Sequence, residues 1–74
     1  MTHVTDIAAT DREILELLYK GLDDATVARK LGLGHRTVQR RVQNLMAALG
    51  VRGRVALGAR AQEIGLFYRQ QQTP

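Results

Sequence analysis

The sequence predicts an all-α domain of four helices. Apolar residues recur at helical spacing in successive segments, and no segment alternates apolar and polar residues over a length that would suit a strand. Glycines and potential N-cap residues separate these segments, as is typical of helix boundaries. A chain of 74 residues, 45% of them hydrophobic, suits one small globular domain. We expect an arm or linker end over residues 1–9, the domain over 10–66 and a polar tail over 67–74.

The first predicted helix starts at Thr10. Thr10 and Glu13 have the spacing of a capping box, in which the hydroxyl and the carboxylate each accept a hydrogen bond from a backbone N–H. An apolar stripe follows at helical spacing, and Gly21 suits the C-terminal stop. Its members are Ile14, Leu15, Leu17, Leu18 and Leu22. This stripe predicts one buried face.

The second predicted helix is capped by Asp23 or Asp24 and ends at Gly32. The connection to the next helix is the short segment Gly32-Leu33-Gly34. Its glycines permit positive φ, which a sharp corner between helices requires. Leu33, between them, is expected to pack into the core. The inward residues of this helix are Val27, Ala28 and Leu31.

The third predicted helix spans about residues 35–49 and has two distinct faces. At about 100° per residue, the apolar side chains gather on one side and the long polar side chains on the other. The apolar side holds Val38, Val42, Leu45, Met46 and Leu49. The polar side holds Arg36, Arg40 and Gln43, with Gln39 beside them.

The fourth predicted helix covers about residues 53–64 and is weakly amphipathic. Gly58 stands in its middle, where glycine costs about 1 kcal/mol relative to alanine. Gly65 suits its end.

Charge is strongly segregated along the chain. The formal net charge is +4, yet no Asp or Glu occurs from Ala25 to Gln62. The cations in that window are Arg29, Lys30, Arg36, Arg40, Arg41, Arg52, Arg54 and Arg60. Such segregation concentrates positive potential over one region and predicts a polyanionic partner. We expect the positive charges of the 32–45 segment to have no partner within the chain. The alternative is a solvated basic surface that serves solubility.

Two helices joined by a tight glycine corner, with a basic outer face on the second, are typical of a helix-turn-helix. The arginine fork can donate to O6 and N7 of guanine together, and a glutamine amide suits adenine. Arg40, Gln39 and Gln43 are therefore the predicted base-reading residues. The alternative for the two glutamines is ordinary helix-favouring surface polarity.

The chain resembles the LuxR/FixJ-type (GerE-like) helix-turn-helix domain from Thr10 to Leu66. No single motif is specific, but several stand in the family's order at matching spacing. They are T-x-R-E from Thr10 to Glu13, G-L at Gly21, V-A-x-x-L-G-L from Val27 to Leu33, T-V at Thr37, L-G-V from Leu49 to Val51, Arg54, Ala61 and Gly65.

The resemblance implies the DNA-binding output domain of a bacterial transcriptional regulator, without a wing, whose third helix enters the major groove. The base-reading positions it implies are Gln39, Arg40 and Gln43, and the DNA-backbone positions are Arg36, Thr37 and Arg41. A homodimer contact is implied on the fourth helix, at Val55, Gly58, Ala59 and Gln62.

Four further residues admit more than one role. Arg29 and Lys30 suit either phosphate contact or the negative end of their helix dipole. His35 can touch a phosphate when charged, although such a residue is more often simply exposed. Arg54 is expected to be structural and to hold the corner between the third and fourth helices.

The sequence departs from the family pattern at several positions. Gly34 stands where the family usually has Ser or Thr, so the cap supplies no hydroxyl. Gln39 stands where Lys is frequent, which moves this position from phosphate contact toward base reading. Arg41 stands where His is frequent and restores the positive charge that is lost at position 39. Leu57 and Gly58 replace a common Ala and a larger aliphatic residue, which makes a dimer contact less secure than DNA binding.

Other function classes find little support. The sequence holds no Ser/His/Asp arrangement, phosphate loop or metal cluster, so no enzyme, cofactor, metal or small-molecule site is expected. No apolar run is long enough to span a membrane, and a cytoplasmic protein is expected. Double-stranded DNA is the expected partner, bound as a homodimer. The alternatives are a sigma-factor-like promoter-reading domain, which depends on RNA polymerase, and a basic protein-interaction module.

Overall fold

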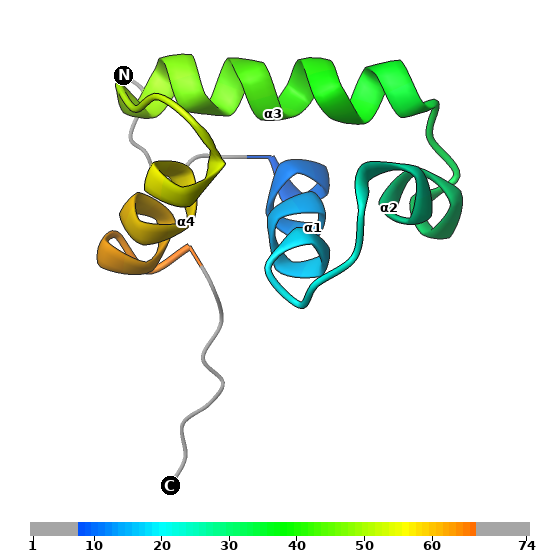
Figure 1. Ribbon diagram of the computed structural model, residues 1–74, viewed down its shortest axis with the longest axis horizontal. Helices are drawn as coiled ribbons and strands as arrows, with labels where there is room; N and C mark the ends of the chain where they lie inside the picture. Colours follow the sequence, from blue (N-terminus) through cyan, green and yellow to red (C-terminus); the bar gives the residue numbers. More distant parts are fainter. Residues whose placement is uncertain (1–7, 67–74) are drawn as a thin grey trace, which may run out of the picture.

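The computed structural model describes residues 8–66. Over those residues the chain forms four helices and no strand: α1 (Ala9–Leu18), α2 (Asp24–Leu31), α3 (His35–Leu49) and α4 (Arg54–Glu63). The predicted all-α class is confirmed. α3 lies along one side of the molecule, with the other three helices on its opposite side (Figure 1). The predicted arm, apart from its last two residues, and the predicted tail lie outside the described residues, so these divisions stay predictions.

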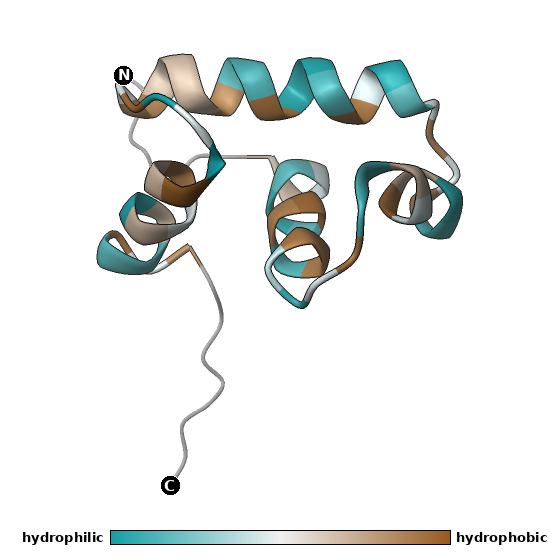
Figure 2. Ribbon diagram, in the orientation of Figure 1, coloured by the Kyte–Doolittle hydropathy of each residue, from teal (hydrophilic) through white to brown (hydrophobic). Residues whose placement is uncertain are grey.

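The core lies where the inner face of α3 meets the other helices. Figure 2 shows the hydrophobic residues of α3 on the side that faces them. The buried apolar side chains are Ile14, Leu15, Val27, Ala28, Val38, Val42, Leu45, Leu57, Ala61 and Leu66. The predicted inner face of α3 is confirmed, although Met46 and Leu49 are only half-buried. Burial of this face directs the opposite, polar face of α3 to solvent.

The start of α1 differs from the prediction. The helix begins at Ala9, and its N-cap residue, Ala8, makes no side-chain hydrogen bond. Thr10 therefore lies within the first turn, where its hydroxyl cannot act as the N-cap, and Glu13 is exposed. The predicted capping box is wrong because the helix extends further toward the N-terminus than the sequence signal. Gly21 takes a φ of 106° in the turn after the helix, as suits a stop.

α2 has an aspartate at its N-cap and a glycine at its C-cap. Asp23, one of the two predicted candidates, is the N-cap, and its Oδ1 accepts a hydrogen bond from the Thr26 N–H at 2.8 Å. Gly32 ends the helix in the left-handed region, at φ 69°, where glycine is least strained. Gly34 instead has an extended backbone at φ −75°. Gly32 therefore supplies the positive φ that the corner requires, and Gly34 does not.

α3 spans the residues predicted for it. Gly34 is its N-cap, without a side-chain hydrogen bond, and Gly50 ends it in the left-handed conformation. Leu33, in the corner before it, is half-buried and packs against the core. The corner therefore fixes the start of α3 against the helices beneath it.

α4 begins and ends within one residue of its predicted bounds, with Gly53 as its N-cap. In its middle, Gly58 lies against the ring of Tyr19, the residue that follows α1. A Cβ at Gly58 would come 2.6 Å from the Tyr19 Cε1. The Tyr19 hydroxyl also donates a hydrogen bond to the backbone carbonyl of Arg54. Glycine at this position thus permits the close contact between Tyr19 and α4.

Candidate nucleic-acid interface

Four long polar side chains project from the face of α3 opposite the core. Arg36, Gln39, Arg40 and Gln43 are all exposed, and we call these four residues the recognition face. Positions i, i+3, i+4 and i+7 share one side of a helix. Together with Arg54, from the start of α4, they line one open pocket on the surface. The predicted outward placement of these residues is confirmed.

The two arginines of the recognition face form no ion pair within residues 8–66. The ion pairs there involve Arg41, Arg54 and Arg60. α3 itself contains no Asp or Glu that could neutralise Arg36 or Arg40. Their charge is therefore available to an anionic partner without competition from an intramolecular acceptor.

Arg41 is paired, which corrects the expectation that the cations of this segment have no partner in the chain. Its Nη1 lies 2.9 Å from Oδ1 of Asp11, on α1. Arg41 sits about 140° around the helix from Arg36, at the edge of α3 that faces α1. Its side chain is still 38% exposed. Any contact between Arg41 and the DNA backbone would therefore compete with Asp11, a residue that the sequence reasoning missed.

The other residues predicted to contact the DNA backbone lie around the corner between α2 and α3. His35 is exposed and Thr37 is half-buried, both in the first turn of α3. Arg29 and Lys30 are exposed in the last turn of α2. Their position also suits the negative end of the α2 dipole, so both roles predicted for them stay open.

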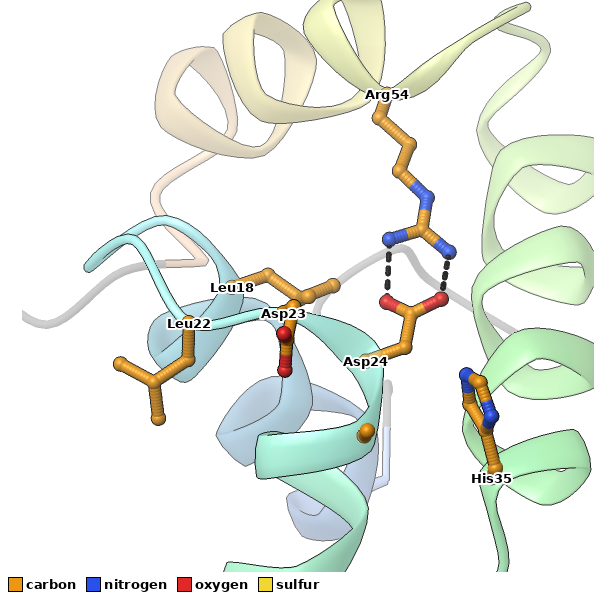
Figure 3. Close-up of a pocket in the computed structure, with 7 residues that line it drawn as sticks. Leu18, Leu22, Asp23, Asp24, His35 and Arg54 are labelled. Carbon is orange, nitrogen blue, oxygen red and sulfur yellow. Dashed lines mark hydrogen bonds and ion pairs between the residues drawn. The ribbon is translucent and has the colours of Figure 1, made fainter.

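Arg54 is structural, as expected, but not at the expected place. Its Nη1 and Nη2 donate to the two carboxylate oxygens of Asp24, at 2.6 and 2.8 Å (Figure 3). The pair joins the start of α4 to the start of α2 and does not hold the corner between α3 and α4. The hydrogen bonds from Arg54 hold the pKa of Asp24 below its ordinary value of 3.8. The same hydrogen bonds raise the pKa of Arg54.

The residues predicted to form a dimer contact differ in their exposure. Val55 is 89% exposed, and Ala59 and Gln62 are exposed as well. Gly58 is half-buried against Tyr19 of the same chain. The outer apolar surface of α4 is therefore small, and the dimer contact stays a prediction.

In the part of the chain that the structure describes, no group of His, Cys, Asp and Glu residues is arranged to hold a metal ion. No helix between residues 8 and 66 combines the length and apolar character needed to cross a bilayer.

Comparison with known proteins places the chain in a family. Residues 6–61 match the luxR family of bacterial regulatory proteins. This range contains α1, α2, α3 and most of α4, and therefore the whole recognition face. A similar protein is the bialaphos biosynthetic pathway regulatory protein of Streptomyces hygroscopicus, which is 47% identical over 64 residues. The match covers 84% of this chain and 25% of that relative, so the chain spans about a quarter of the relative's length. No solved structure gave a significant match. The chain belongs to the luxR family of bacterial regulatory proteins.

Proposed function

We propose that this domain binds double-stranded DNA in a sequence-specific manner, as the output domain of a bacterial transcriptional regulator. The observation that carries the proposal is the recognition face. It combines two arginines that have no ion pair within the described residues with two exposed glutamines, on one side of one helix. A face that served only solubility would not need this concentration of donors for base edges.

The geometry of α3 suits the major groove. That groove is about 12 Å wide and admits an α-helix, and the other three helices all lie on one side of α3, which leaves its opposite side open (Figure 1). Arg40 would read guanine through O6 and N7, and Gln39 and Gln43 would read adenine through N6 and N7. Bases would thus be read from the middle of the recognition face.

Phosphate contacts would surround the base contacts. Arg36, Thr37 and His35 lie in the first turn of α3, where the helix dipole adds partial positive charge. Arg29 and Lys30 would reach the backbone from the end of α2. These contacts fix the position of the helix and carry no sequence information directly.

We also propose that two copies meet on DNA through the outer surface of α4. Val55 supports this proposal because so large an apolar side chain is 89% exposed. Ala59 and Gln62 would lie beside it, whereas Gly58 is already covered by Tyr19. A dimer of this kind would place its half-sites about 10 bp apart. Footprints of bound duplex would show two protected half-sites at that spacing.

The biological role we propose is control of transcription. The relative from Streptomyces hygroscopicus is described as a pathway regulatory protein. A regulator of this kind would act at promoters, with RNA polymerase as the next partner. Which genes it controls depends on the DNA sequence that α3 selects.

The base-reading role of Arg40 is tested by substitution to alanine. On the duplex that the wild-type domain prefers, Arg40→Ala should cost about 1–3 kcal/mol of binding free energy. The loss should depend on the base pair at one position of each half-site. A panel of duplexes with every base pair at each position measures this dependence. An equal loss on all of them would exclude base reading by Arg40 and favour an indiscriminate basic surface.

Arg36→Ala provides the contrast, because a phosphate contact is independent of sequence. It should weaken binding to every duplex and reduce the slope of log K against log salt by about one unit. Arg60→Ala is the matched control. It removes one positive charge from α4, where the Arg60 Nη1 lies 3.0 Å from Oε1 of Glu63. Arg60 does not line the pocket that the recognition face forms with Arg54. If Arg36→Ala and Arg60→Ala change the slope equally, Arg36 has no specific phosphate role.

A further inference from the structure

Arg54 lies beside the recognition face, although it comes from α4. It lines the same open pocket as Arg36, Gln39, Arg40 and Gln43. Its side chain is 40% exposed, so a ligand on α3 can reach it. The ion pair with Asp24 therefore does not remove Arg54 from the surface.

The pairing leaves part of the guanidinium free to donate. Arginine carries five N–H donors in a planar fork. The two hydrogen bonds to Asp24 use one hydrogen on each terminal nitrogen. Three N–H groups remain, and the planar fork suits bidentate recognition of anions such as phosphate. Held by Asp24, Arg54 can bind one further anion without breaking its ion pair.

Asp24 is well placed to fix the direction of this fork. It stands at the start of α2, and its side chain is only 16% exposed. Both of its oxygens contact Arg54. A carboxylate that accepts from both terminal nitrogens restricts the guanidinium to one orientation.

We propose that Arg54 is a further phosphate-contacting residue of the DNA interface and that Asp24 is the residue that positions it. This inference rests on the proposed function. The phosphate involved would belong to the strand that passes between the recognition face and the start of α4. Because Asp24 neutralises the charge of Arg54, the pair adds little net charge to the interface. Its contribution is a hydrogen-bond donor held in a fixed orientation toward one phosphate.

The test is a scan of the preferred duplex with single uncharged methylphosphonate linkages. In the wild-type domain, neutralising the phosphate that Arg54 contacts should weaken binding about tenfold, the value of one charge-assisted hydrogen bond. In Arg54→Gln, the same neutralisation should cost almost nothing, while the penalties at the other phosphates remain. Arg60→Gln, the control on the same helix, should keep the complete wild-type profile. If Arg54→Gln also keeps every wild-type penalty and lowers affinity uniformly, Arg54 has only a structural role.

The positioning role of Asp24 is tested by a matched pair of neighbouring substitutions. Asp24→Asn and Asp23→Asn each remove one negative charge from the start of α2, so both should raise affinity for any duplex. Asn is as good an N-cap as Asp, so Asp23→Asn leaves the helix start intact. Only Asp24→Asn should reduce the methylphosphonate penalty at the Arg54 phosphate. Equal phosphate profiles for the two variants would remove the positioning role.

The phosphate scan remains interpretable if Arg54→Gln misfolds or if the domain does not read base sequence. Where Arg54→Gln does not fold at the temperature of the assay, Arg54→Lys replaces it, because lysine keeps the charge but cannot bridge Asp24 and a phosphate with a planar fork. Failure of the proposed function is also distinguishable from failure of this inference. A domain that prefers no sequence would contradict base reading. On a random duplex, a greater loss for Arg54→Gln than for Arg60→Gln would still support the phosphate contact, and an equal loss would overturn it.

Discussion

Gly53 and Gly34 are both N-cap glycines, but their backbones differ. Gly53 has φ 80° and ψ 158°, a region that is essentially restricted to glycine. Gly34 has φ −75° and ψ 151°, a region open to every residue. The sequence shows two similar glycines before two helices, and only the backbone conformation separates a required glycine from a replaceable one.

Serine substitutions at these two positions should therefore have opposite effects on stability. Gly53→Ser should destabilise the domain by about 1–3 kcal/mol because the backbone becomes strained. Gly34→Ser should stabilise it by a few tenths of a kcal/mol because serine can cap α3. Urea denaturation of both variants measures the difference. Equal effects would contradict the backbone argument.

The contact between Gly58 and Tyr19 predicts coupled mutations. In a Tyr19→Ala background, Gly58→Ala should stabilise the domain by about 1 kcal/mol through helix propensity. In the wild type that gain should disappear, because the new Cβ would lie 2.6 Å from the Tyr19 ring and displace it from the Arg54 carbonyl. A double-mutant cycle in urea measures the coupling. Additive effects would show that Gly58 does not need to be glycine.

At the scale of the elements, local signals predicted the most. α3 has a strong helical period, a glycine before it and a glycine after it, and its predicted bounds are confirmed. Its outer face followed from the same period. The start of α1 was predicted wrongly. The capping-box motif is a signal of only four residues, and the helix begins before it, at Ala9.

Contacts between elements could not be predicted from local signals. Asp11 with Arg41 and Asp24 with Arg54 are each separated by 30 residues. Many acids and bases in this chain could pair, and only the packing of α1, α2 and α4 beneath α3 selects these two. The sequence therefore indicated which residues face outward on α3 but not which cations are already paired.

The Asp11–Arg41 ion pair predicts that Asp11, on α1, reduces the contribution of Arg41 to DNA binding. Asp11→Asn should release Arg41, raise affinity for any duplex and steepen the salt dependence by up to about one unit. Glu13→Gln removes the same charge from an exposed position of α1 and is the matched control. Fluorescence anisotropy across a salt series compares them. If both variants steepen the dependence equally, the effect comes from net charge and the ion pair has no part in it.

At the scale of the whole molecule, Asp24 and Arg54 join the starts of two helices that lie behind α3. Because this pairing holds the pKa of Asp24 below 3.8, folding favours the ionised carboxylate. The stabilisation is fully present above the ordinary pKa and is lost as the pH falls through the lowered one. Acid should therefore weaken the link between α2 and α4.

Comparison of the wild type with Asp24→Asn should reveal this loss. At neutral pH the substitution should reduce the free energy of unfolding by about 1 kcal/mol, the typical net value of a hydrogen bond. The difference between the two proteins should shrink below about pH 4 as Asp24 becomes protonated. Urea denaturation at a series of pH values measures it. A difference that is constant down to low pH would mean that the ionised carboxylate contributes nothing.

The central claim is that α3 reads base sequence, and selection from a pool of randomised duplexes at about 0.15 M salt tests it most directly. Sequences that the wild-type domain enriches should contain a fixed guanine, and a parallel selection with Arg40→Ala should lose the preference at that position alone. A bound pool with the same composition as the starting pool, despite salt-sensitive retention of DNA, would contradict the claim. The basic surface of α3 would then bind anions without reading sequence, and an acidic protein would become the better candidate partner.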